Sequence, residues 1–324
     1  MITRRQLIAA GAATAALGAL PVRAQSPQPL RVIIGFAPGG SADVIARHFG
    51  AHAKMDGVSA VIVESRPGAG GRIAVEAVRN SNDGRTVLVT PGSILSIYPH
   101  VYDKLPYDSV KDFDPVTPLA FVPFSLSVGP MVPERVKTLK DFAQWCKENP
   151  GDASYGSPGG GTTPHFVGAM FGQTTGINYQ HVPYRGGAPA LQDVMAGQIA
   201  SSVNVVSEAM QLARAGKVRV LAVTSAQRLA QLPDVPTVAE AGFADLQSDE
   251  WFGLFAPAGT APERIEALNA AARRAFATPT VQAAMAEMAF TIEPTTPAAF
   301  GERLRSDIAR WGPVVKQTGF KAEA

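Results

Sequence analysis

The sequence predicts an α/β fold with two lobes. Short apolar runs alternate with amphipathic stretches along most of the chain, a rhythm typical of βαβ units and parallel sheets. The chain has 324 residues, which is long for a single hydrophobic core and favours two domains. With 31 Gly and 26 Pro, the segments between the runs are expected to contain many tight turns.

Residues 1–25 have the composition of an export signal. Arg4 and Arg5 make a basic start, residues 7–20 are apolar and uncharged, and Val22-Arg23-Ala24 offers the small residues that a signal peptidase reads. The apolar run is shorter than the roughly 20 residues of a membrane span, which favours a cleaved signal peptide over an anchor. We therefore predict a periplasmic protein. Because an Arg pair also suits twin-arginine export, that route and general secretion both stay open.

The exported chain is nearly neutral. The full chain has 29 basic and 27 acidic side chains, of which three Arg and no acid lie in residues 1–24, so the formal charge of the remainder is −1. No basic field remains for nucleic acid or lipid headgroups, and we expect no nucleic-acid partner. Cys146 is the single cysteine and cannot form an internal disulfide, so packing must supply the stability.

The elements that follow the leader begin with a buried strand. Residues 30–36 form a β-branched run, and Ala37-Pro38-Gly39-Gly40 follows as a turn. Ser41 is expected to cap a helix that ends near Met55. A second strand is expected at 60–64, followed by a Gly-rich loop at 66–71 and a helix at 72–80. A third strand is expected at 86–90.

A second series of elements starts near Val128. Thr138 is expected to cap a helix at Leu139–Glu148, which Asn149-Pro150-Gly151 ends. Four strands are expected in this series, at 153–156, 179–182, 199–204 and 217–223. Helices are expected from His165 to Thr175 and after Gly187.

The last part of the chain predicts one strand, at 251–256, followed by three helices at 262–277, 280–288 and 297–318. A chain that ends in helices after its last strand often packs back onto its first domain. We therefore predict a discontinuous first lobe of residues 26–127 plus 250–324, and a second lobe of residues 128–249. Two crossing strands near 125–129 and 251–254 would form the hinge, with the ligand cleft between the lobes.

Gly-rich loops between a strand and a helix start recur in both predicted lobes, at 36–43, 64–72, 155–165 and 183–188. A helix start leaves backbone N–H groups unpaired at the positive end of the helix dipole. Glycine lets a ligand approach that backbone closely, and ligands of open α/β sheets collect beyond the carboxyl ends of the strands. The pattern indicates an anion site shared by the two lobes.

The sequence lacks the motifs of nucleotide binding, of serine hydrolysis and of zinc-protease chemistry. No G-x-x-x-x-G-K-[ST] occurs, and Ile73 stands where a dinucleotide fingerprint has its third Gly. Asp43 replaces the last Gly of a hydrolase G-x-S-x-G elbow around Ser41. His48 and His52 are one helical turn apart, but no Glu follows His48 as in a zinc protease. We therefore expect no catalytic residue, no metal and no cofactor.

The sequence leaves the roles of three polar residues near these loops open. His165 starts a helix after a Gly-rich loop and could either donate to an anion or serve packing and capping. Asp43 could stabilise a helix start, orient the Ser41 loop or meet a ligand ammonium group. Asn204 ends a predicted strand that faces the cleft, where it is a reasonable polar contact.

A series of short motifs resembles the receptors of tripartite tricarboxylate transporters, also called Bug proteins. They occur in order along nearly the whole exported chain: FAPGGSAD at 36–43, ESRPGAGG at 64–71, LPYD at 105–108, HVPYRG at 181–186, LAVTS at 221–225, PDVPT at 233–237, WFGL at 251–254 and PAGT at 257–260. Two departures stand out, because Ser65 replaces the family's usual Asn and Pro158 removes a backbone donor from the second-lobe loop.

The resemblance implies a type II periplasmic-binding fold that closes on its ligand, and delivery to a membrane permease with one large and one small integral subunit. It implies that carboxylates are held by backbone groups, hydroxyls and waters from one loop of each lobe. The ligand-binding residues expected on this basis, together with the cleft position Asn204, are Phe36, Ala37, Gly39, Gly40, Ser41, Asp43, Ser157, Gly161, Thr162 and His165.

The sequence therefore predicts a monomeric, non-catalytic receptor for a small organic anion. The loop expected from each lobe contains hydroxyls and backbone donors but no Arg or Lys. We therefore expect a cleft with few ionisable groups, since an anion held in this way needs no buried counter-charge. A sensor that presents its solute to a signalling partner and a secreted hydrolase are the alternatives, and a neighbouring permease gene or signalling gene would separate transport from sensing.

Overall fold

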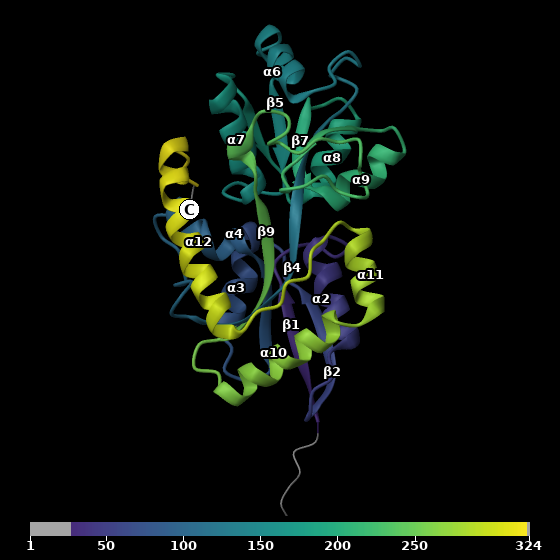
Figure 1. Ribbon diagram of the computed structural model, residues 1–324. Coiled ribbons are helices and arrows are strands. Elements are labelled where there is room, and N and C mark those ends of the chain that lie inside the picture. The colour runs from purple at the N-terminus through teal and green to yellow at the C-terminus, as the bar shows by residue number, and fades with distance from the viewer. Residues whose placement is uncertain (1–26, 323–324) are drawn as a thin grey trace, which may run out of the picture.

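The computed structural model describes residues 27–322. The predicted signal peptide lies outside these residues. Two α/β lobes are stacked along the long axis of the molecule, and two long strands, β4 and β9, run between them (Figure 1). Within the described residues, no helix is long and apolar enough to cross a membrane. The predicted α/β fold with two lobes is confirmed.

The first lobe contains a five-stranded sheet in the order β2-β1-β3-β9-β4. Strands β1, β2 and β3 are parallel to one another, as the βαβ rhythm predicts, whereas β9 pairs antiparallel with both β3 and β4. The bounds of these strands are Gln28–Ile34 for β1, Val58–Ser65 for β2, Thr86–Pro91 for β3, Phe113–Val128 for β4 and Asp249–Pro257 for β9.

Strand β4 belongs to both sheets. Its residues 113–123 pair with β9, and residues 124–128 pair with β7 and β8 of the second lobe. The chain therefore passes from one lobe to the other within a single strand. The predicted hinge strand at 125–129 begins just after this change of partners, whereas 251–254 pair with β3 and β4 inside the first sheet. The lobe boundaries stay a prediction.

The full length of β4 was not expected, because it contains Pro115, Pro118 and Pro123. Proline lacks the N–H that a central strand donates and is usually confined to edges or bulges. Two of these prolines lie at shifts in the β4–β9 register, between Pro115 and Thr117 and between Pro118 and Ala120. The irregular register therefore accommodates residues that otherwise indicate a loop.

The second sheet has the order β4-β7-β5-β6, with β8 also pairing with β4. Each of its four remaining strands was expected from the sequence. Their bounds are Ser154–Ser157 for β5, Gln180–Pro183 for β6, Ser201–Val205 for β7 and Arg219–Val223 for β8.

The longest helices of the structure lie where the sequence predicts helices. Thr138 caps its helix in a full capping box with Asp141, as predicted. The cap expected at Ser41 is wrong: Gly40 occupies the cap position, and Ser41 is the first helical residue. The helices are α2 (Ser41–His52), α3 (Arg72–Arg79), α4 (Gly92–Ser96), α5 (Tyr98–Val101), α6 (Leu139–Glu148), α7 (Thr163–Thr175), α8 (Gly187–Met195), α9 (Val206–Arg214), α10 (Pro262–Phe276), α11 (Pro279–Glu287), α12 (Pro297–Thr318) and the short 3₁₀ turns η1 (Ala69–Gly71) and η2 (Ala244–Leu246).

The C-terminal helix α12 returns to the first lobe and also reaches the second. It packs on β4, α4 and α5 and touches α7 (Figure 1). Beyond it, Phe320 packs edge-to-face against His165, with ring centroids 4.3 Å apart, and the backbone N–H of Ala322 donates to the carbonyl of Val101. Helix α12 therefore packs mainly on elements of the first lobe, and the discontinuous first lobe stays a prediction.

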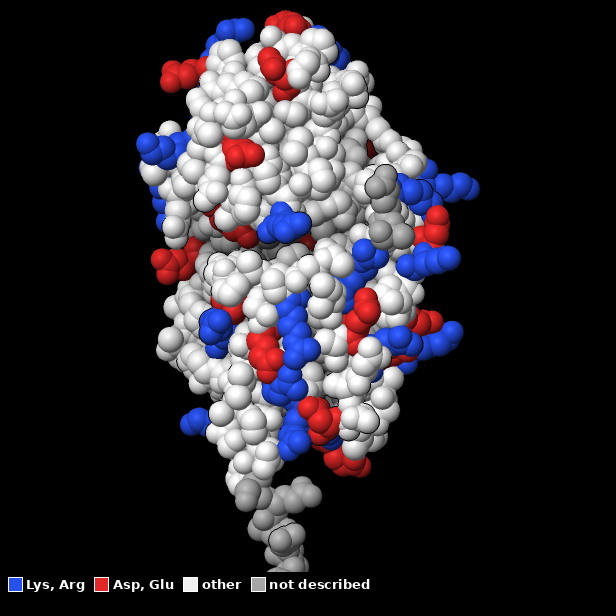
Figure 2. All heavy atoms as spheres, turned by 180° about the vertical axis from the view of Figure 1, so that it is seen from behind, with Lys and Arg blue, Asp and Glu red and all other residues white. Residues whose placement is uncertain are grey.

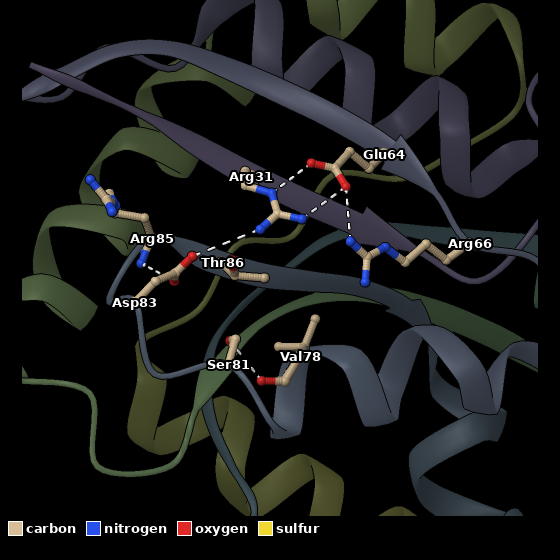
Figure 3. A network of polar contacts seen from close by, with 8 residues as sticks. All are labelled: Arg31, Glu64, Arg66, Val78, Ser81, Asp83, Arg85 and Thr86. Atoms are coloured by element: carbon tan, nitrogen blue, oxygen red, sulfur yellow. Dashed lines mark hydrogen bonds and ion pairs between the residues drawn. The ribbon is translucent and has the colours of Figure 1, made fainter.

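Ion pairs link β1, β2 and the segment before β3 at one side of the first sheet (Figure 3). Arg31 on β1 donates from Nε to Glu64 on β2 at 2.6 Å, and its Nη1 lies 3.9 Å from Asp83 before β3. Arg66 donates to the other Glu64 oxygen at 3.2 Å. Elsewhere the surface charge is mixed: Figure 2 shows Lys and Arg interspersed with Asp and Glu on one face, and a hollow between the two lobes.

Candidate functional site

A cavity of about 350 Å³ lies between the two lobes, at the carboxyl ends of their strands. Its first-lobe wall comes from the β1–α2 loop and the end of β3, and its second-lobe wall from the starts of α7, α8 and α9. The wall is formed by Phe36, Ala37, Pro38, Gly39, Gly40, Ser41, Ala42, Pro91, Ser93, Phe124, Pro158, Thr162, Pro164, Arg185, Gly186, Gly187, Ala188, Pro189, Val205, Glu208, Glu250 and Phe252.

The β1–α2 loop is held in shape by Asp43. Gly39 has a φ of 87°, a conformation that glycine adopts readily, and its N–H donates to Asp43 Oδ2 at 3.0 Å. Arg47 donates to the same oxygen at 2.8 Å. Asp43 is buried and is not part of the cavity wall. Of its open alternatives, the geometry supports orientation of the Ser41 loop.

Ser41 lies in the cavity wall at the start of α2, where backbone N–H groups lack an intrahelical acceptor. Its hydroxyl donates to Glu208 Oε1 across the cavity, at a long 3.5 Å. Since Ser41 belongs to the first lobe and Glu208 to α9 of the second, this contact joins the lobes over the site.

The second-lobe loop uses several of its polar groups internally. Thr162 lies in the cavity wall, but its hydroxyl donates to the carbonyl of Gly159 at 2.7 Å. Gly161, at a φ of 76°, donates its N–H to His165 Nδ1 at 3.1 Å. Pro158 in this loop also contributes to the wall. The start of α7 therefore faces the cavity with fewer free groups than the start of α2.

His165 and Ser157 lie behind the wall rather than in it. Ser157 is fully buried, and its hydroxyl lies 2.7 Å from His181 Nε2. The rings of His165 and His181 stack with centroids 4.0 Å apart. Burial lowers the pKa of His165 to about 3 and that of His181 to about 4. Both rings are neutral at physiological pH, and the packing alternative for His165 agrees with this position.

The structure thus places the eleven expected residues in two groups. Six of them form part of the cavity wall: Phe36, Ala37, Gly39, Gly40, Ser41 and Thr162. The other five lie outside the wall: Asp43, Ser157, Gly161, His165 and Asn204. Contact of any of them with a ligand stays a prediction.

Three charged residues of the wall were missed in the sequence. Glu250 on β9 is buried, and its Oε1 accepts the N–H of Ser93 at 2.5 Å and the hydroxyl of Thr163 at 3.3 Å. Glu208 lies in the first turn of α9, a helix that the sequence pattern did not reveal. Arg185, which is exposed, belongs to the loop before α8.

These residues change the expected electrostatics of the cleft. Burial raises the pKa of Glu250 to about 7, and it raises the pKa of Glu208 to about 7 as well. The available signal was the position of Glu208 four residues after Asn204, which ends a strand that was expected to face the cleft. A cleft with few ionisable groups was expected from the loops alone; two carboxyl groups and one Arg lie in the wall instead.

The wall can hold a small molecule by its charge pattern and shape. Three aromatic rings, those of Phe36, Phe124 and Phe252, supply apolar surface. The starts of α2 and α8 supply backbone N–H groups at the positive ends of helices. Among the described residues, no group of three or more His, Cys, Asp or Glu side chains is arranged to hold a metal ion.

Comparison with known proteins places this arrangement in a family. The chain is 32% identical to the protein BugT of Bordetella pertussis over 313 residues, which cover 95% of each chain. It resembles the structure of MatC from Rhodopseudomonas palustris with bound malate, with a TM-score of 0.82, 29% identity and coverage of 89% of this chain and 99% of the other. It also resembles the structure of the R. palustris protein Rpa4515 with adipate, with a TM-score of 0.84, 30% identity and coverage of 91% of this chain and 98% of the other.

The match to the family described as tripartite tricarboxylate transporter family receptor extends over residues 45–320. Its structural relatives include a periplasmic transporter with a TM-score of 0.85 and 35% identity over 92% of this chain. Family and relatives are binding proteins of the periplasm rather than enzymes. The chain belongs to the family of tripartite tricarboxylate transporter receptors, and its role is that of a solute-binding receptor for such a transporter.

Proposed function

We propose that this receptor captures a small carboxylate in the cavity between its lobes and releases it to a membrane permease with one large and one small integral subunit. The observation that carries the proposal is the meeting of helix starts from both lobes at one cavity, with the start of α2 on one side and that of α8 on the other. Both present backbone donors and positive dipole ends to the same space.

The bound acids of the relatives support the choice of ligand class. MatC is described with malate and Rpa4515 with adipate, and both resemble this chain over about nine-tenths of its length. Both compounds are small dicarboxylates. The cavity of about 350 Å³ lies within the ~300–1,000 Å³ range of small-molecule sites.

We also propose that the protein works as a monomer in the periplasm and has no catalytic activity. The Ser157–His181 pair has the contact that a nucleophile and its base would need, but Ser157 is fully buried behind the wall. The hydroxyls within the wall belong to Ser41, Ser93 and Thr162, and no His is part of it. A Ser–His pair is therefore absent from the cavity wall, and the Ser41 hydroxyl meets Glu208 only at a long 3.5 Å.

A thermal-shift screen of the purified protein against malate, adipate and other organic acids tests the proposed ligand class. The protein is first unfolded and refolded to remove any ligand retained from expression. A ligand at about 100 times its dissociation constant adds ~2.7 kcal/mol of stability, which raises the unfolding midpoint by a few degrees. A rise with one acid and none with its methyl ester supports an anion site. Equal rises with acid and ester would contradict it.

A further inference from the structure

Glu208 is a carboxyl group in the cavity wall that forms no ion pair with any described residue. Its Oε1 accepts only the long bond from Ser41, at 3.5 Å. The residue is partly exposed, but Oε2 is shielded from solvent and has no hydrogen-bond partner. An ionised carboxylate in this position would leave a shielded oxygen without a donor, which is costly.

A second unpartnered acceptor lies beside it. Asn204 is fully buried, its Nδ2 donates to the carbonyl of Gly187 at 3.4 Å, and its Oδ1 has no partner. A Cβ on Gly187 would overlap Glu208 Oε2 and would lie 3.0 Å from Asn204 Oδ1. The two oxygens therefore flank the same point, which the missing side chain of Gly187 leaves open.

Both oxygens are shielded acceptors, and each lacks a hydrogen to accept. An ionised Glu208 cannot supply it, whereas a protonated carboxyl can donate from Oε2 to Asn204 Oδ1 and still accept from Ser41 at Oε1. One proton thus gives both shielded oxygens a partner.

The neighbouring charges do not favour the ionised form of Glu208. Asp43 on α2 is already bound to Arg47 and to the N–H of Gly39. Glu250 on β9 is a second acid in the wall. Arg185 is exposed in the loop before α8 and makes no ion pair with another described residue. Burial is the largest cause of the raised pKa of Glu208, and the bond from Ser41 opposes it.

We propose that Glu208 takes part in the ligand site as a neutral carboxylic acid, with its proton donated to Asn204, and that this proton is required for binding of an anionic ligand. The proposal rests on the proposed function of the cavity. A neutral Glu208 leaves this side of the wall without negative charge when a carboxylate enters. Loss of the proton places a like charge in the cavity and weakens binding. Asn204 acts as a positioning residue, since it lies outside the wall.

The protonation state can be measured without any ligand. NMR titration of ¹³C-labelled Glu side-chain carboxyls is carried out on the wild-type protein and on Glu208→Gln and Glu250→Gln. We expect a carboxyl signal with a midpoint near 7 that is lost in Glu208→Gln and kept in Glu250→Gln. If every signal removed by Glu208→Gln titrates below pH 5, Glu208 is ionised in the native protein and the proposal is overturned.

The coupling to ligand is measured by calorimetry with malate between pH 6 and 8.5, a range over which malate keeps its charge. We expect the wild-type dissociation constant to rise towards tenfold per pH unit above the midpoint, because one proton is bound with the anion. Glu208→Gln carries the shape of the neutral acid and a donor for Asn204, so its affinity should stay constant and exceed that of the wild type at pH 8.5. The same pH dependence in both proteins, or lost binding in Glu208→Gln at pH 6, contradicts the proposal.

Two further outcomes separate the proposed ligand class from the proposed protonation of Glu208 and from the role of Asn204. If neither malate nor adipate binds the wild-type protein at pH 6, and no other acid of the panel does, the proposed ligand class fails while the titration still decides the protonation of Glu208. Asn204→Ala removes the acceptor of the proton, so the Glu208 midpoint should fall although the fold is kept. An unchanged midpoint in Asn204→Ala would remove Asn204 from the pair.

Discussion

The hydroxyl of Thr163 donates to Glu250 Oε1 at 3.3 Å, and this bond joins the start of α7 in the second lobe to β9, one of the two long strands between the lobes. The same oxygen accepts the N–H of Ser93 at the start of α4. One buried carboxyl therefore holds three elements together beside the cavity. We therefore expect the Glu250 carboxyl to contribute more to the relative position of the lobes than to direct contact with a ligand.

Replacement of Glu250 by Ala should destabilise the protein by about 1–3 kcal/mol, because the buried N–H of Ser93 loses its acceptor. Glu250→Gln retains an acceptor oxygen and should cost less. Urea unfolding of both variants measures the difference, with Glu302→Ala as a control because that residue is exposed on α12. Equal losses for Glu250→Ala and the control would show that the three-way contact contributes no stability.

The stability of the protein should fall as the pH rises from about 4.5 to about 7. Burial raises the folded-state pKa of Glu250 to about 7 from its ordinary 4.5, so between these values the folded state binds more protons than the unfolded state, and stability decreases with pH. The loss assigned to this group is on the order of 1–3 kcal/mol. Urea midpoints at pH 5, 6 and 7.5 should show a smaller slope in Glu250→Gln. An identical slope in that variant would assign the effect to other groups.

The Arg31–Glu64 ion pair at the edge of the first sheet should contribute weakly (Figure 3). Both side chains are about one-third exposed, at 35% and 31%, and exposed pairs contribute ~0–1 kcal/mol. The hydrogen bond from Arg31 lowers the pKa of Glu64, so its contribution is present at neutral pH and is lost as the pH falls through the folded-state value. Glu64→Gln should reduce the urea midpoint slightly at pH 7 and by less at pH 3, and 1 M NaCl should shrink the difference at pH 7.

Ser41→Ala should weaken ligand binding by about 1 kcal/mol, which is roughly a fivefold rise in the dissociation constant. The hydroxyl lies in the cavity wall and joins the lobes through Glu208. Calorimetry with the acid found in the screen measures the effect. Ser225→Ala serves as a matched control, since its hydroxyl bonds only within an exposed turn. Unchanged affinity in a folded Ser41→Ala protein would remove Ser41 from the ligand contacts.

Most of the fold could be predicted because its elements carry local signals. The strand β1, the cap at Thr138 and the helix α12 each depend on short-range patterns of apolar residues and caps. The failures have local causes too. Strand β4 contains three prolines, which a central strand usually lacks. The first turn of α9 follows β7 with no loop between them, so its start was hidden in the apolar run.

The candidate site could be predicted in part for a similar reason. The Gly-rich loop before α2 lies in the cavity wall, as its sequence indicated. His165 and Ser157, which stand in an equivalent loop, lie behind the wall, because their side chains find partners in His181 and Phe320. Those partners are 16 or more positions away in the chain, and no sequence pattern at His165 reveals them.

The sequence by itself determined the class of fold, the two-lobed organisation and the family, because hydrophobic periodicity, turn residues and ordered motifs are properties of neighbouring residues. Only the tertiary structure decided which groups face the cavity. It brings Glu208 of the second lobe opposite Ser41 of the first and places Asn204 against the bare Cα of Gly187. The burial and protonation of a carboxyl depend on atoms that are distant in the chain and close in space, so the chemistry of the cleft follows from the packing of the lobes.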